Sequence, residues 1–252
     1  DLATDYTMPN QITANGVTDN VISIGDYAYA NAKISNNETI TVSNDQVYFI
    51  GNHAFENLDI TYASFSKATW MGEYAFYGTK MLEGKFASLT TIGSYAISGI
   101  DELAHLTLGP VNNYADAAIS NNKHLQQLFI NDSSMNITVT GTPFENIGTE
   151  TGGRLRIYVP DSEAIITYYK KLMSNYADYI YATGTIVGSF INDPINYDIG
   201  EYSIRDISVI DKDGNMQTSW EVIEYHGEDL SSDYEFPETL VLKSADLTSS
   251  VT

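Results

Sequence analysis

Apolar and polar positions follow a recurring eight-residue pattern in the first part of the chain. The pattern is an apolar residue, glycine, a polar residue, a ring-bearing residue, alanine, a large residue, a variable residue, and asparagine or glycine. It occurs as IGDYAYAN from residue 24, IGNHAFEN from residue 50, MGEYAFYG from residue 71 and IGSYAISG from residue 92. The apolar first, fifth and sixth positions have the spacing of the buried face of a short helical turn. Asparagine and glycine at the eighth position favour the left-handed conformation that ends such a turn.

Two weaker copies extend the pattern, VNNYADAA from residue 111 and VTGTPFEN from residue 139. The fifth copy has Asn112 in place of glycine and Ala118 at the last position, and the sixth has Thr140 and Pro143. Successive copies therefore lie roughly 20–29 residues apart, a period typical of repeats that combine one strand with a short return. Each copy is expected to cover the core left open by the copy before it.

A second apolar pattern, LxxLxL, lies between the copies and predicts one half-buried strand in each repeat. It is clearest in LAHLTL and LQQLFI. Aligned on its last core residue, it ends at Val42, Phe65, Phe86, Leu108, Ile130 and Val159. The expected fold is an α/β repeat solenoid with one short parallel strand per repeat.

The four octets resemble the BspA-type leucine-rich repeats of bacterial surface proteins. The resemblance covers about residues 20–182 and includes the run IYVPDSEAIITYYKKLMSNYADYIYA, which is similar to the closing segment of that family. There, Pro160 and Asp161 are expected to open a capping helix. The resemblance implies an exported, extracellular, cell-surface bacterial protein that binds other macromolecules and has no enzymatic activity.

The composition changes near residue 184, which predicts a boundary between residues 1–183, the solenoid, and residues 184–252, a small all-β module. Alternating apolar residues on either side of DKDGN predict a hairpin in this second part. Asp211, Asp213 and Asn215 of DKDGN invite a calcium-loop interpretation, but the bidentate Glu of such a loop is missing, which favours a simple turn.

Charge limits the partners, because 12 Lys and Arg oppose 33 Asp and Glu for a net charge of -21. Such a surface repels phosphate backbones and anionic lipids, so nucleic acid is not an expected partner. No run approaches the roughly 18 apolar residues of a membrane span, so this segment is not expected to insert directly into a membrane. The chain has no cysteine, which excludes disulfides and thiol chemistry.

Catalytic motifs are absent, and no cofactor, metal or catalytic residue is expected. The sequence SFSK at residues 64–67 lacks the partner motifs of the SxxK enzymes. Asp101 and Glu102 are interpreted as a solvated turn, and His53 as a replacement for the tyrosine of the other copies.

The exposed side of the strands is the best candidate for a binding site. Two rows of outward residues are expected there, Thr39 with Thr41 at one end and Phe129, Arg156 and Tyr158 at the other. Aromatic residues on a polar face are typical of contact surfaces. The candidate partner-binding residues are Tyr62, Glu83, Lys85, His105, Gln127, Phe129, Arg156 and Tyr158.

Three functions remain open from the sequence. The first is a non-enzymatic interaction module for adhesion or for binding an extracellular protein along the strand face. The second is a carbohydrate-binding surface protein, because the rings of 19 Tyr and 2 Trp are able to stack on sugars. The third is a hydrolase with an unrecognised carboxylate pair in the β module.

Overall fold

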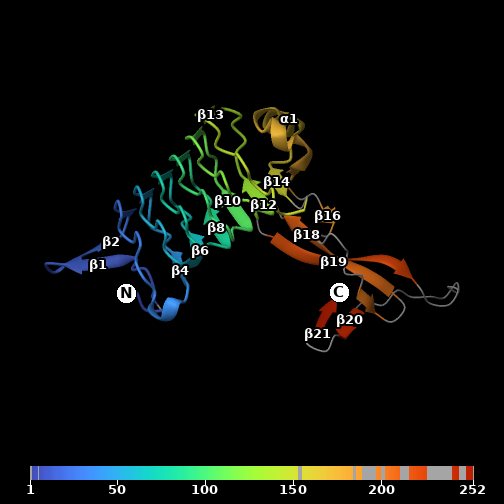
Figure 1. The fold of residues 1–252 in the computed structure, drawn as a ribbon, viewed down its shortest axis with the longest axis horizontal. Coiled ribbons are helices and arrows are strands. Elements are labelled where there is room, and N and C mark those ends of the chain that lie inside the picture. Colours follow the sequence, from blue (N-terminus) through green and yellow to red (C-terminus); the bar gives the residue numbers. More distant parts are fainter. Residues whose placement is uncertain are drawn as a thin grey trace. The chain divides into compact units, whose positions relative to one another are not determined.

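The computed structural model describes residues 2–4, 6–152 and 155–183, together with six strands within residues 186–251. The chain divides into two compact units, Asp1–Ala182 and Thr183–Thr252, and each is described by itself. The first unit is a stack of repeats that begins near β4 and is closed by α1 (Figure 1).

A seven-stranded parallel sheet runs the length of the stack, in the order β15-β14-β12-β10-β8-β6-β4. Each of the six repeats contributes one strand, as the LxxLxL pattern predicted, and the segment after the capping helix adds β15. The strands are β4 (Ile40–Ser43), β6 (Ile60–Ser64), β8 (Glu83–Phe86), β10 (His105–Leu108), β12 (Gln127–Ile130), β14 (Arg156–Val159) and β15 (Ile180–Ala182).

A second parallel sheet of six strands, two residues each, forms at the start of every octet. The sequence pattern does not predict this sheet, because two residues are too few to show an alternating pattern. Its strands are β3 (Ser23–Ile24), β5 (Phe49–Ile50), β7 (Trp70–Met71), β9 (Thr91–Ile92), β11 (Asn113–Tyr114) and β13 (Thr138–Val139).

The remainder of each octet is a chain of tight turns, so the expectation of a helical turn was wrong. Alternate N–H groups donate hydrogen bonds to the next repeat. The N–H of Tyr27 donates to the carbonyl of Asn52 at 2.9 Å, and that of Tyr29 donates to the carbonyl of Ala54 at 2.8 Å. The intervening N–H of Ala28 donates within the turn, to Gly25 at 3.3 Å. Bonding to the next repeat satisfies more backbone groups than an isolated helical turn, which leaves its terminal groups open.

The strand of the first repeat lies two residues from its expected register. Val42 pairs with Ala63 and Ser43 with Ser64, so Asn44 takes the place expected for Val42. Asn44 is buried, and its side chain donates to the carbonyl of Pro9 and accepts from the N–H groups of residues 46 and 47. A buried, hydrogen-bonded asparagine thus occupies a position that is apolar in the other repeats.

The fifth copy begins at Tyr114, three residues later than expected, because β11 aligns Tyr114 with Ile92. Its octet is therefore YADAAISN, with Ala115 in place of glycine and Asn121, at φ 59°, in the last position. Val111 was predicted to be the first residue of this octet because it is apolar. It is fully buried, like the first-position residues of the inner octets.

The core consists of the apolar residues of the octets and strands, one layer per repeat. Phe55 and Phe76 stack with ring centroids 4.8 Å apart, and Phe65 and Phe86 pack beside them at 5.7 Å and 5.3 Å, respectively. All four rings have no exposed surface. This shared aromatic core joins neighbouring repeats.

The C-terminal cap is the helix α1 (Glu163–Leu172), followed by the 3-10 helix η2 (Ser174–Tyr179). The helix was predicted, although it begins after Ser162 rather than at Pro160. Its buried residues are Ile165 and Tyr169, and the Tyr169 hydroxyl donates to the buried carboxylate of Asp132 at 3.1 Å.

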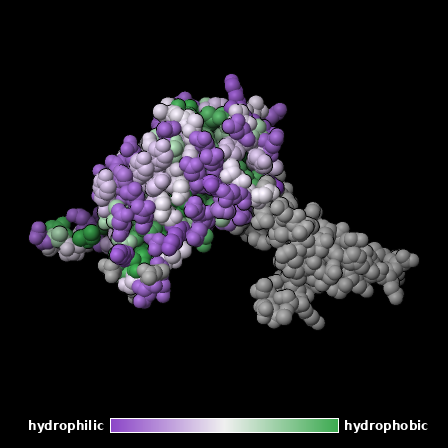
Figure 2. Space-filling view, viewed as in Figure 1, coloured by the Kyte–Doolittle hydropathy of each residue, from purple (hydrophilic) through white to green (hydrophobic). Residues whose placement is uncertain are grey.

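The N-terminal segment covers the first repeat, because Met8 is buried and the hydroxyls of Tyr6 and Tyr29 hydrogen bond at 2.7 Å. A hairpin of β1 (Gln11–Ala14) and β2 (Val17–Asn20) projects from this end, with every residue exposed (Figures 1 and 2). The short 3-10 helix η1 (Ser35–Asn37) lies between the first octet and β4.

The second unit is described by its strands alone. The predicted hairpin is present, because β18 (Tyr202–Ile210) and β19 (Met216–Tyr225) pair antiparallel along their length. DKDGN, with Asp211, Asp213 and Asn215, lies outside the described residues. The other strands are β16 (Ile186–Gly188), β17 (Tyr197–Ile199), β20 (Leu240–Lys243) and β21 (Thr248–Val251).

Candidate functional site

The outward residues of the seven-stranded sheet form the predicted strand face. We define the strand face by its two rows, which the strand register aligns across neighbouring repeats. One row is Thr41, Tyr62, Glu83, His105, Gln127 and Arg156, and the other is Ser43, Ser64, Lys85, Thr107, Phe129, Tyr158 and Tyr181. All eight candidate residues therefore lie on one face. Thr41 falls in the row of Tyr62 rather than that of Ser64, and Thr39 lies outside both rows.

The half of the strand face on β6, β8 and β10 is partly open to solvent. Lys85 Nζ lies 2.9 Å from Glu83 Oε1 and 5.9 Å from the centre of the Tyr62 ring. The hydrogen bond to Glu83 raises the pKa of Lys85, and burial lowers the pKa of His105. This half therefore offers an aromatic ring, an ion pair and an imidazole to a partner.

The half on β12 and β14 is more closed than expected. Phe129 is 6% exposed and Tyr158 has no exposed surface, so the expectation that both rings are exposed was wrong. Aligned side chains on adjacent strands are close enough to cover one another, and the rings of Tyr158 and Tyr181 lie 6.2 Å apart. Burial raises the pKa of Tyr158 to about 12.

Polar groups of this closed half are not fully satisfied. Gln127 is 4% exposed, and neither its Nε2 nor the Tyr158 hydroxyl has a hydrogen-bond partner within the described part of the chain. The Arg156 guanidinium lies 5.5 Å from the centre of the Tyr181 ring. Buried polar atoms without partners are uncommon in folded proteins, and with almost no exposed surface these two are not accessible to a binding partner.

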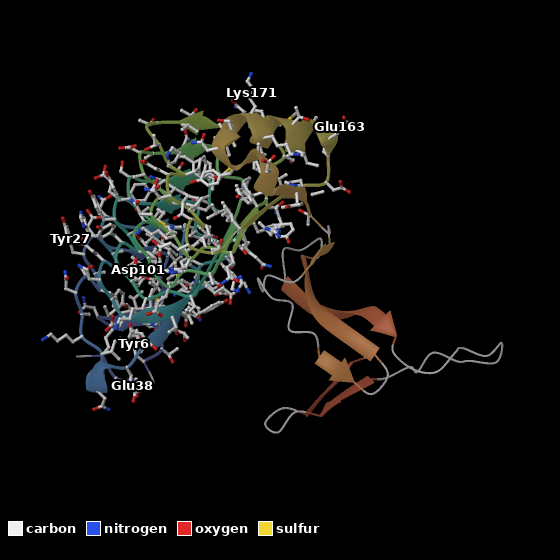
Figure 3. The ribbon with its side chains drawn as sticks, turned by 45° about the vertical axis from the view of Figure 1, so that its right-hand side comes forward. Tyr6, Tyr27, Glu38, Asp101, Glu163 and Lys171 are labelled. Atoms are coloured by element: carbon white, nitrogen blue, oxygen red, sulfur yellow. The ribbon has the colours of Figure 1, made fainter. Side chains whose placement is uncertain are left out.

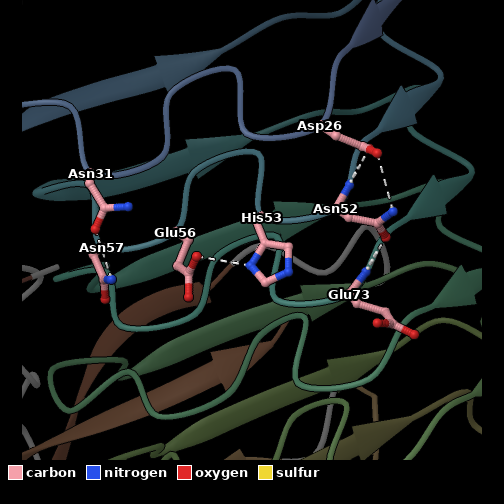
Figure 4. Close-up of polar contacts among 7 residues, drawn as sticks. All are labelled: Asp26, Asn31, Asn52, His53, Glu56, Asn57 and Glu73. Carbon is pink, nitrogen blue, oxygen red and sulfur yellow. Dashed lines mark hydrogen bonds and ion pairs between the residues drawn. The ribbon is translucent and has the colours of Figure 1, made fainter.

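The octet turns carry a polar ladder rather than a binding site (Figure 4). The Asp26 carboxylate accepts from the Asn52 N–H at 2.7 Å, and Asn52 Oδ1 accepts from the Glu73 N–H at 2.9 Å. His53 Nδ1 lies 2.8 Å from Glu56 Oε2. These contacts link one repeat to the next, or one side of a turn to the other, and use the groups that a ligand would need.

A stack of rings follows the fourth position of the octets. His53 lies between Tyr27 and Tyr74, with centroids 4.6 Å and 5.0 Å away, and Tyr95 continues the stack at 5.0 Å from Tyr74. His53 therefore replaces a tyrosine in this stack, in line with its interpretation as a structural substitution. Tyr27 ends the stack and is 61% exposed (Figure 3).

Metal-ligating side chains are not clustered in the described ranges. Within residues 2–4, 6–152 and 155–183, no three His, Asp or Glu side chains gather in a way that could hold a metal ion. Asp101 and Glu102 lie exposed in a turn (Figure 3). No helix in the described part is long and apolar enough to cross a bilayer.

One hollow of 440 Å³ lies between the sixth octet and the cap, away from every candidate residue. Phe144 and Val139 line one side, and Leu172, Met173 and Tyr176 line the other.

The parallel strand ladder, the recurring octets and the capping helix define a leucine-rich repeat solenoid. Residues 22–146 match the BspA type leucine rich repeat region in six copies. The repeat region of this chain therefore belongs to the BspA-type leucine-rich repeat family. No curated protein matches the chain in sequence.

Several solved structures are similar to the chain at low identity. The pneumococcal vaccine antigen PcpA is 18% identical with a TM-score of 0.49, over 62% of this chain and 40% of the antigen. A leucine-rich repeat protein from Bacteroides ovatus is 17% identical with a TM-score of 0.35, over 64% of this chain and 52% of that one. A leucine rich cell surface protein from Faecalibacterium prausnitzii is 17% identical with a TM-score of 0.22, over 61% of this chain and 68% of that protein. The chain thus spans 40% of the antigen and 52% of the Bacteroides protein.

Proposed function

We propose that this chain is a non-enzymatic interaction module of an exported bacterial cell-surface protein. Residues 1–183 act as the binding domain, and the partner is an extracellular protein that lies along the strand face. Membership of the BspA-type family supports the surface location, because that family occurs in bacterial surface proteins. The proposed contacts are Tyr62, Glu83, Lys85 and His105, because Gln127, Phe129 and Tyr158 lie buried in the closed half of the same face.

The observation that carries the proposal is the continuous strand face. Parallel register places side chains of the same row on neighbouring strands, about 4.8 Å apart, so the rows form an extended surface without insertions. Its open half holds Tyr62 beside Lys85, and tyrosine is one of the residues enriched in interface hot spots. Direct contact is therefore assigned to Tyr62, Glu83, Lys85 and His105.

The test measures binding of the purified chain to a panel of extracellular-matrix and cell-surface proteins by surface plasmon resonance. The triple variant Tyr62→Ala, Lys85→Ala, His105→Ala removes three side chains of the open half. We expect it to weaken binding by more than about 2 kcal/mol, as for hot-spot residues.

A control variant matches the three residue types away from the strand face. Tyr77→Ala, Lys80→Ala and His124→Ala change exposed side chains of the turns, and this triple should cost under about 1 kcal/mol. Equal losses for the two triples, or no binding to any protein of the panel, would contradict the proposal.

A further inference from the structure

An exposed aromatic cluster lies on the outer side of the six-stranded sheet, away from the rows of the strand face. Phe49 is 50% exposed, Tyr48 41% and Trp70 36%, and Ile22 beside them is 54% exposed. We call Tyr48, Phe49 and Trp70 the aromatic platform. Contiguous apolar surface of this kind on a folded chain marks an interaction site more often than isolated exposed residues do.

Strand geometry holds the rings of Phe49 and Trp70 outward. Successive side chains of a strand point to opposite faces, and Ile50 and Met71 face the core with no exposed surface. Phe49 and Trp70, which precede them, must therefore point to solvent. The two are direct neighbours in the parallel register, so their strands lie about 4.8 Å apart.

The row continues with polar side chains in the same register. Thr91 pairs with Trp70 across the next strand, and Asn113 pairs with Thr91 across the one after. Thr91 is partly exposed and Asn113 fully so. Two rings, a hydroxyl and an amide thus follow one another along the axis of the solenoid.

The rings of the platform are partly exposed and are not covered by other rings within the described part of the chain. None of its three rings stacks on another ring there, whereas Tyr27, His53, Tyr74 and Tyr95 cover one another at 4.6–5.0 Å. Sugars pack on the face of an aromatic ring rather than on its edge. The platform therefore offers several partly exposed rings in one row, whereas the stacked column exposes mainly its end ring, Tyr27.

The platform has no charged side chain, although the chain has a net charge of -21 at pH 7. Each repeat contributes two adjacent residues to this surface, and none of the twelve is ionisable except through the Tyr48 phenol. They are Ile22, Ser23, Tyr48, Phe49, Thr69, Trp70, Thr90, Thr91, Asn112, Asn113, Ile137 and Thr138. Carboxylates of the octets, Asp26, Glu73 and Asp116, lie a few residues further along the chain and disfavour an anionic ligand.

We infer that the aromatic platform binds a neutral glycan that lies along the row across β5, β7, β9 and β11. The C–H faces of successive sugar rings pack on Phe49 and Trp70, whose π faces are electron-rich. Thr91 and Asn113 hydrogen bond with sugar hydroxyls. The site is independent of the strand face and of the protein partner proposed for it.

The experiment follows tryptophan emission while neutral oligosaccharides are titrated into the whole chain. The chain has 2 Trp, so the background variant Trp220→Phe leaves Trp70 as the reporter. The probes are six-unit cello-, xylo-, manno- and chito-oligosaccharides, with heparin and polygalacturonate as anionic polymers. We expect at least one neutral series to shift the Trp70 emission in a saturable manner, and the anionic polymers to leave it unchanged.

Calorimetry with the binding oligosaccharide then compares three variants whose folding is checked by circular dichroism. Trp70→Ala and Phe49→Ala should each weaken binding at least about tenfold, by analogy with nucleic-acid bases, whose binding falls by this order when the aromatic side chain under them is removed. Tyr77→Ala, an equally exposed ring outside the platform, should change the affinity less than about twofold. The strand-face triple variant should bind the oligosaccharide normally.

Three results would overturn the inference. One is the absence of a response to every neutral series, and another is unchanged affinity in Trp70→Ala. The third is a platform variant that loses a protein partner while no glycan binds, which would make the platform a protein contact.

Discussion

The fourth residue of each octet shows how position in the repeat decides the role of a side chain. Tyr27, His53, Tyr74 and Tyr95 all have φ between 53° and 58°, in the left-handed region. That conformation costs roughly 1–2 kcal/mol for a residue with a Cβ. Stacking of each ring on the next recovers roughly 0.5–1.5 kcal/mol, and the N–H of each bonds to the following repeat. The column is therefore explained by stability alone.

Phe76 is the single side chain whose removal we expect to lower the free energy of unfolding most. Phe76→Ala removes a ring with no exposed surface that touches Phe55, Phe65 and Phe86. We expect a loss of about 3–5 kcal/mol in the free energy of unfolding, from lost transfer energy and a cavity. Urea denaturation followed by circular dichroism measures it. The neighbouring Tyr77→Ala, on an exposed ring, should cost under about 1 kcal/mol, and a similar loss for both variants would refute the assigned register.

Among the elements, the octet turn depends on how closely two repeats approach. A Cβ on Gly72 would lie 2.7 Å from the backbone nitrogen of Asn52, and one on Gly51 would lie 2.6 Å from that of Asp26. Gly25 belongs to the first octet, and a Cβ there would meet nothing within 4 Å. The glycines of the inner octets thus serve close backbone approach, whereas Gly25 has no such constraint.

These two environments make a matched pair of substitutions. Gly72→Ala should destabilise the chain by about 1–3 kcal/mol, because the repeats must separate to admit the Cβ. Gly25→Ala should change stability by less than about 0.5 kcal/mol. Ala115 occupies the same position in the fifth octet, so a local shift is able to admit a methyl group and the effect should stay within this range. Equal unfolding midpoints in urea for the two variants would show that the position is not closely packed.

Across the whole molecule, acidic charge acts on both units at once. The net charge of -21 at pH 7 opposes compaction through long-range repulsion, and few cations are present to offset it. Ion pairs such as that of Lys85 with Glu83 remain at the surface, where each contributes little.

Salt should therefore stabilise this protein. Raising NaCl from about 0.01 M to about 0.15 M shortens the screening length from about 30 Å to about 8 Å. If this relieves about 1 kcal/mol of repulsion, the midpoint of thermal unfolding rises by about 2–4 °C. Differential scanning calorimetry measures the shift, and KCl should act like NaCl because screening does not depend on the cation. A midpoint that falls or stays constant with salt would contradict this account.

The sequence pattern predicts only part of the candidate site. Tyr62, Glu83, Lys85 and His105 lie on the strand face as expected, because alternation along a strand depends on local sequence. The burial of Phe129 and Tyr158 was not predictable, since it depends on what packs beside each strand. Phe49 and Trp70 were missed although they directly precede the apolar residues Ile50 and Met71, a signal that could have found them.

The repeat, its approximate period, the strand in each repeat and the capping helix were all predictable from the sequence. These follow from apolar positions that recur at fixed spacing, which any copy of the repeat must satisfy in the same way. The second sheet, the phase of the fifth octet at Tyr114 and the place of Asn44 in the first strand became visible only in the folded chain. In each of these cases contacts formed on folding overrode the local pattern: a backbone ladder formed from two-residue strands, Val111 filled the core like an octet residue, and hydrogen bonds to Pro9 and to the N–H groups of residues 46 and 47 satisfied a buried amide.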